Sequence, residues 1–266
     1  MRTSGPLFSI ITTMILAVFM AVGYPFECVM ASDGVKKDQV QQNAPKPAPG
    51  RDAPLWEKGK PLRMDQMPPI RKMGEGRLLI GNIVIDKHIP MITVRGEVNM
   101  DKGLVEYLAC GYRGKLHESV LKIDAEPFYL NIALLLVGLE PGDRKLESQG
   151  EDSIPEGDPV EISVQWVDEA KKRHTRRAED LIFNQQTGKS MQHTDWVYTG
   201  SKIVNGRFMA QIEHSIASTY HDPYALLDHR LPTGSDDRLY FVNEEIVPPK
   251  GTKVVMIIKP AGAEQK

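Results

Sequence analysis

Apolar and polar side chains alternate along much of the chain from about residue 76 onward. Residues 78–85 and 92–98 are rich in β-branched side chains and flank a polar turn, a pattern that predicts two antiparallel strands. Residues 160–167 alternate as a half-buried strand does. Further strand-like segments lie at 120–123, 181–183, 196–204, 207–213, 216–220, 238–242 and 254–258, and residues 104–110 form either a strand or a short helix.

Two segments have helical signals instead. After Pro127, apolar residues recur at helical spacing and cover nearly the whole circumference, which predicts a helix buried on more than one side. Residues 222–228 begin with Asp-Pro and predict a short helix capped by Asp222. Asn205-Gly206 predicts a tight hairpin turn. The fold class expected is therefore mainly β (α+β), an antiparallel, sandwich-like domain with one buried helix and one short helix.

The first residues predict export. Residues 7–23 are apolar and uncharged, and Val29-Met30-Ala31 offers small residues for a signal peptidase. We expect residues 1–31 to be either a cleaved signal peptide or an uncleaved anchor in the inner membrane, with the remainder periplasmic or secreted. Residues 32–75 are rich in Pro, Lys and Gln and predict a disordered linker, so the folded domain is expected at 76–262.

Composition narrows the possible partners and cofactors. Lys and Arg number 33 against 35 Asp and Glu, so we expect no nucleic-acid partner, and membrane contact only through an uncleaved N-terminal segment. Cleavage after Ala31 would leave Cys110 as the single cysteine, which is expected to be a buried apolar residue. The cysteine pattern predicts no iron-sulfur cluster and no c-type haem, and leaves a divalent metal open.

Three consecutive polar residues, His117, Glu118 and Ser119, are the leading site candidates. Neutral imidazole and carboxylate groups are good metal ligands, and the second half of the chain supplies His214, His221, Asp222 and His229. On a regular strand His117 and Glu118 would point to opposite faces, so a shared site needs a turn in the backbone. The metal site expected on this hypothesis contains His117, Glu118 and His221.

Two other interpretations of the same residues remain. Ser119 could be a nucleophile with His117 or a distant histidine as its base, although the following residues, 120–123, predict a strand that enters the core. Alternatively, Glu118 and Ser119 are structural, with the carboxylate bound to backbone N–H groups or paired with Lys115 or Arg113.

Several motifs together resemble the YdjY-domain family of exported bacterial proteins. They are Gly-Lys-Leu-His-Glu-Ser-Val-Leu at 114–121, the segment from Pro127 to Gly142, Trp-Val-Tyr-Thr-Gly-Ser at 196–201, His-Asp-Pro at 221–223 and Ala-Leu-Leu-Asp at 225–228. The resemblance covers about residues 78–260 and implies an exported setting. Some relatives are described as ferredoxin-like with iron-sulfur clusters, but this chain lacks the cysteines for one.

We therefore expect an exported cell-envelope protein that acts as a non-catalytic binding or accessory module for an envelope protein or a small ligand. The competing hypothesis is a metal-binding protein or metal-dependent enzyme with a site at His117 and Glu118.

Overall fold

The computed structural model describes residues 69–262. The predicted leader at 1–31 and most of the predicted linker at 32–75 lie outside the described residues. The first strand, β1 (Arg71–Gly74), begins a few residues before the expected domain boundary. No helix among residues 69–262 has the length and apolar character needed to cross a membrane.

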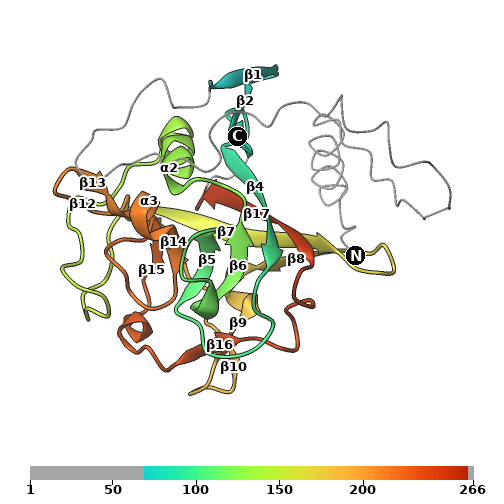
Figure 1. Ribbon diagram of the computed structural model, residues 1–266, viewed down its shortest axis with the longest axis vertical. Helices are drawn as coiled ribbons and strands as arrows, with labels where there is room; N and C mark the ends of the chain where they lie inside the picture. The colour runs from blue at the N-terminus through green and yellow to red at the C-terminus, as the bar shows by residue number, and fades with distance from the viewer. Residues whose placement is uncertain (1–68, 263–266) are drawn as a thin grey trace, which may run out of the picture. The chain divides into compact units, whose positions relative to one another are not determined.

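The main sheet closes into a barrel of eight strands (Figure 1). Closure occurs because β4 pairs with β17 on one side and with β6 on the other. In order around the barrel the strands are β4 (Met91–Val98), β17 (Lys253–Pro260), β7 (Asp158–Val167), β11 (Trp196–Tyr198), β15 (Leu227–His229), β14 (Ser215–Ser218), β5 (Tyr107–Gly111) and β6 (Ser119–Ile123). The expected β-rich fold is confirmed, but the sheet closes on itself where two packed sheets were expected.

Shorter strands extend this barrel. The meander β1, β2 (Arg77–Ile80) and β3 (Ile83–Asp86) continues from the first half of β4, and β8 (Arg173–Arg177) pairs with β7. A separate sheet has the order β10-β9-β16, with β10 (Lys189–Ser190), β9 (Ile182–Asn184) and β16 (Tyr240–Val242). Short 3₁₀ helices occupy Leu116–Glu118, Ala178–Leu181 and Pro232–Ser235.

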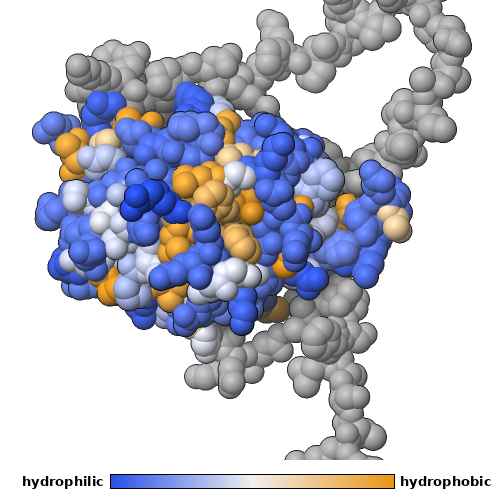
Figure 2. All heavy atoms as spheres, turned by 90° about the horizontal axis from the view of Figure 1, so that it is seen from below, coloured by the Kyte–Doolittle hydropathy of each residue, from blue (hydrophilic) through white to orange (hydrophobic). Residues whose placement is uncertain are grey.

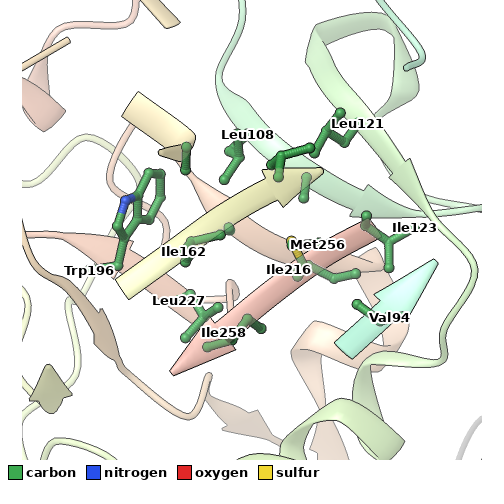
Figure 3. Close-up of a cluster of buried hydrophobic side chains, with 14 of the residues drawn as sticks. Val94, Leu108, Leu121, Ile123, Ile162, Trp196, Ile216, Leu227, Met256 and Ile258 are labelled. Atoms are coloured by element: carbon green, nitrogen blue, oxygen red, sulfur yellow. The ribbon is translucent and has the colours of Figure 1, made fainter. Parts of the chain in front are cut away.

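Alternate side chains of the barrel strands form the core (Figure 3). Val94 and Met256 are cross-strand partners on β4 and β17, and Met256 also pairs with Val164 of β7. All three are completely buried. Burial of each such side chain contributes about 1.5–3 kcal/mol of transfer free energy. Successive side chains of a strand point to opposite faces, so the period-two alternation at 160–167 predicted a strand with one face in the core.

Helix α2 (Pro127–Leu136) forms where it was predicted, with one face fully buried and most of its other side chains half-buried. Leu130, Ala133 and Leu134 lie in the core, whereas Leu135 keeps 48% of its surface exposed. The side chain of the N-cap residue Glu126 makes no capping bond. The backbone N–H of Phe128 instead donates to Oε1 of Gln211 at 3.0 Å, so the helix start is satisfied from another element.

The second helix is displaced from its predicted position. Residues 222–228 do not form a helix: Oδ1 of Asp222 accepts the N–H of Tyr224 at 2.8 Å, which makes a turn, and Leu227 starts β15. The short helix is α3 (Met209–Glu213), in a segment predicted as a strand. The Asn205-Gly206 turn is confirmed, with φ of 50° and 71°, but it joins only β12 (Ile203–Val204) and β13 (Arg207–Phe208).

Two neighbouring strand pairs of the barrel are parallel, although the sequence predicted an antiparallel sheet. β5 and β6 are joined by residues 112–118, and β14 and β15 by residues 219–226. In each case the connection must run back along the barrel before the next strand begins. We call these segments the first and second crossovers, and they carry most of the predicted site residues.

Candidate functional site

A chain of hydrogen bonds joins the two crossovers through the barrel strand between them. Nζ of Lys115, in the first crossover, donates to the hydroxyl of Tyr107 at 3.0 Å. That hydroxyl donates to Oδ2 of Asp222, in the second crossover, at 2.7 Å. Burial raises the pKa of Asp222, and the Tyr107 and Lys115 groups act in the opposite direction. Tyr107 and Asp222 are both buried, so this contact is closed to solvent.

Asp228 on β15 holds the second crossover in place. Its Oδ2 accepts the backbone N–H of Asp222 at 3.1 Å. Its Oδ1 accepts the N–H of His229 at 2.7 Å and lies 2.9 Å from Nδ1 of His221. His221 and Asp228 are fully buried, and the opposite ring nitrogen of His221, Nε2, has no hydrogen-bond partner among the described residues. We call Tyr107, Lys115, His221, Asp222, Asp228 and His229 the crossover network.

His221, Asp228 and His229 form a group whose possible ligand atoms lie within 4.8 Å of one another, the spacing that a metal site requires. The nitrogens of His229 are already engaged: Nε2 donates to the carbonyl of Thr219 at 2.8 Å, and Nδ1 accepts the N–H of Leu231 at 3.1 Å. Burial lowers the pKa of His229, consistent with this neutral tautomer. Of the four ring nitrogens of His221 and His229, only Nε2 of His221 keeps a free lone pair, so these hydrogen bonds favour a structural role.

The residues first singled out in the sequence are separated. The imidazole of His117 is 80% exposed, because none of residues 116–118 in the first crossover is buried. Its Nε2 lies 3.5 Å from Oε2 of Glu118. Oε1 of Glu118 lies 3.8 Å from Nζ of Lys115, as the structural interpretation expected. The group with metal-site spacing therefore contains His221 but neither His117 nor Glu118.

Ser119 lies in the barrel wall. Its side chain is fully buried, and Oγ donates to the carbonyl of Leu121 at 2.9 Å. A serine nucleophile needs an exposed hydroxyl and a nearby base, and this geometry provides neither. The hydrolase interpretation is therefore not supported by the structure.

His214 belongs to a different cluster, at the start of α2. It follows α3 in the left-handed conformation (φ 53°), and its ring is buried. Nε2 accepts Nε–H of Arg113 at 3.0 Å and lies 3.9 Å from Oε2 of Glu126. Burial is the main cause that lowers the pKa of His214 to about 4, with Glu126 opposing the shift and Arg113 adding to it.

This low pKa predicts acid sensitivity. An unfolded histidine titrates near pH 6.5, so between about pH 6.5 and 4 the unfolded chain binds a proton that folded His214 does not. Stability should therefore be fully present above pH 6.5 and fall as the pH approaches 4, by at most about 1.4 kcal/mol per pH unit. His214→Asn, which tolerates a positive φ, should flatten this part of the profile in urea unfolding. An unchanged slope in this variant would contradict the assignment to His214.

Sequence reasoning missed three members of the crossover network as site residues. Tyr107, Lys115 and Asp228 are distributed over segments whose proximity depends on the two parallel strand pairs. Asp228 had one available signal, because it is an acidic residue that directly follows the apolar run Ala225-Leu226-Leu227. A buried acidic group at such a position needs hydrogen-bond partners.

A solvent-facing hollow of about 430 Å³ lies between the β9–β10 hairpin and residues 231–233. Its lining combines polar side chains with apolar surface from Leu231, Pro232 and Tyr240, and the exposed surface is mostly apolar. Lys189 is the charged member, and the amide and hydroxyl groups come from Asn184, Gln186, Thr187, Ser190, Gln192 and Thr233. Asn184 Oδ1 accepts the N–H groups of Gln186 and Thr187, which fixes the hairpin turn. Figure 2 shows this end of the molecule, where hydrophilic side chains surround a central band of hydrophobic ones.

Comparisons with known proteins agree with the motif pattern. A family model described as the YdjY domain matches residues 83–259, which include both crossovers and all of the barrel except Pro260 at the end of β17. No curated protein and no solved structure matches the chain significantly. Since the match spans well over half of the sequence, the chain belongs to the YdjY-domain family.

Proposed function

We propose that the protein is an exported, non-catalytic binding module of the cell envelope, and that the β9–β10 hollow is its ligand site. One observation carries this proposal: the candidate acid, base and metal-binding groups of the crossover network are mostly buried and bonded to one another, whereas the hollow is open to solvent. Groups that a substrate cannot reach serve the fold. The apolar leader at 7–23 supports the exported setting.

The lining of the hollow indicates the class of ligand. Amide and hydroxyl groups both donate and accept hydrogen bonds, and Lys189 supplies a single positive charge. Together with the apolar surface of Leu231, Pro232 and Tyr240, these groups suit a ligand that carries hydroxyl or amide groups beside an apolar face and has no charge or a single carboxylate. Acetamido sugars and polar peptide segments of the envelope have this chemistry.

Binding at the hollow can be tested by NMR titration of the full chain in detergent with an N-acetylglucosamine tetramer and, separately, with a Ser/Asn/Gly peptide. We expect one probe to shift signals of residues 184–192 and 231–233. Gln186→Ala together with Gln192→Ala should abolish that response, while Asn205→Ala, away from the hollow, should keep it. If neither probe shifts these signals, the hollow is not the ligand site.

The competing metal hypothesis has its own measurement. Elemental analysis of the purified chain should give no stoichiometric zinc, copper or iron. Stoichiometric metal that is lost in His221→Ala would overturn the non-catalytic proposal in favour of a metal centre at His221, Asp228 and His229.

A further inference from the structure

Helix α2 has an apolar face that the domain covers only in part. At 100° per residue, Phe128, Ile132 and Leu135 lie on the side opposite the buried Leu130 and Ala133. Phe128 and Ile132 are half-buried against the core, and Leu135 is 48% exposed. The sequence of α2, PFYLNIALLL, contains no charged residue. The solvent side of a surface helix is normally polar, and helices that are apolar all round are usually enclosed by protein or lipid. This partly exposed apolar face therefore needs an explanation.

The β12–β13 hairpin adjoins the start of this face. The ring of Phe208 on β13 packs edge-on against Phe128, with centroids 5.9 Å apart. Ile203 is the cross-strand partner of Phe208 and is 73% exposed, and the next residue, Val204, is also exposed. We call Phe128, Ile132, Leu135, Ile203 and Val204 the apolar ridge.

Positive charges flank the hairpin part of the ridge. Residues 202–208, KIVNGRF, contain Lys202 and Arg207 and no acidic residue. Lys202 also reaches Oε2 of Glu147 at 3.2 Å. Exposed apolar side chains beside two cations suit the interface of a bilayer, where the apolar groups enter the acyl region and the cations stay near the phosphates.

We propose that the apolar ridge rests in the interfacial region of a phospholipid membrane, as a contact separate from the N-terminal leader. The apolar leader at 7–23, if retained, would hold the chain at the same bilayer, and residues 24–68 link it to the domain. A symmetric contact between two copies of the ridge is less suitable, because it would bring the Lys202 and Arg207 side chains of both copies together. This inference goes beyond the ligand site and does not rest on it.

The test measures the depth of single fluorescent labels. In a Cys28→Ser background, where Cys110 is buried, an environment-sensitive dye is attached to Ile203→Cys, Leu135→Cys or, as control, Gln186→Cys. Gln186 is suitable because the β9–β10 hairpin lies at the opposite end of the domain from α2 in Figure 1. Each full-length protein is reconstituted into vesicles of phosphatidylethanolamine and phosphatidylglycerol.

Lipids that carry nitroxides on their acyl chains should quench the labels at Ile203 and Leu135 several-fold more than the label at Gln186. Adding Ile203→Glu should reduce the quenching at Leu135 toward the control value. Equal quenching at all three positions would overturn the proposal. A blue shift at Leu135 that depends on protein concentration and not on lipid nitroxides would also overturn it, in favour of a contact between two copies.

Discussion

Asp228→Asn should lower the free energy of unfolding by about 3 kcal/mol, because the new amide group has to face a hydrogen-bond donor. The two carboxyl oxygens of Asp228 accept the N–H groups of Asp222 and His229 and contact Nδ1 of His221. In either orientation of Asn, an NH₂ group replaces one of these oxygens. All of these groups are buried, so water cannot substitute for the lost bond. Urea unfolding followed by circular dichroism measures the change.

The matched control is Asp152→Asn, the same chemical change at an exposed position. It should alter stability by less than about 0.5 kcal/mol. A loss below about 1 kcal/mol in Asp228→Asn would show that the crossover network does not hold the second crossover in the way described.

Gly234→Ala should lower the free energy of unfolding about as much as Asp228→Asn, because the added methyl group would clash with its neighbours. Gly234 lies in the 3₁₀ helix at Pro232–Ser235, and its carbonyl accepts the N–H of His221 at 2.7 Å. A Cβ at this position would lie 2.2 Å from Cε1 and 2.4 Å from Nδ1 of the His221 ring. Because both sides of the contact are packed, we expect a loss of about 3 kcal/mol in the free energy of unfolding.

A double-mutant cycle separates this clash from a general intolerance of alanine. In a His221→Ala background the added methyl group has room, so Gly234→Ala should cost much less there than in the wild type. Gly188→Ala, at an open position with φ of 66°, provides a second comparison and should cost about 1 kcal/mol through backbone strain alone. Equal costs of Gly234→Ala in both backgrounds would contradict the proposed packing.

The sequence predicted those elements whose signals are local. Alternation over 160–167 and the apolar run at 254–258 identified strands that are buried in the barrel, and the apolar period after Pro127 identified α2. Asp222 was expected to bond a nearby backbone N–H, and it does so to Tyr224. The predicted helix at 222–228 was wrong because residues 227–229 instead pair with two barrel strands, β11 and β14. Tertiary pairing overrode the local preference.

The remaining features depend on contacts between distant residues. Closure of the barrel requires β4 to pair with both β6 and β17, and no short-range pattern encodes this choice. The crossover network also depends on distant contacts. Lys115 and Asp222 both bond the hydroxyl of Tyr107 because each lies in a crossover beside β5 or β14. His117 was a leading ligand candidate in the sequence, but its imidazole is 80% exposed and lies outside the crossover network.

The position of the last strand has a consequence for biogenesis. β17 ends at Pro260 and pairs along its length with β4 on one side and β7 on the other, so it occupies a gap between strands formed much earlier in the chain. The barrel wall cannot be completed until the ribosome has synthesised residues 253–260. For an exported chain, as proposed above, such late completion would keep the polypeptide open during passage through a secretion channel, where premature assembly would block it.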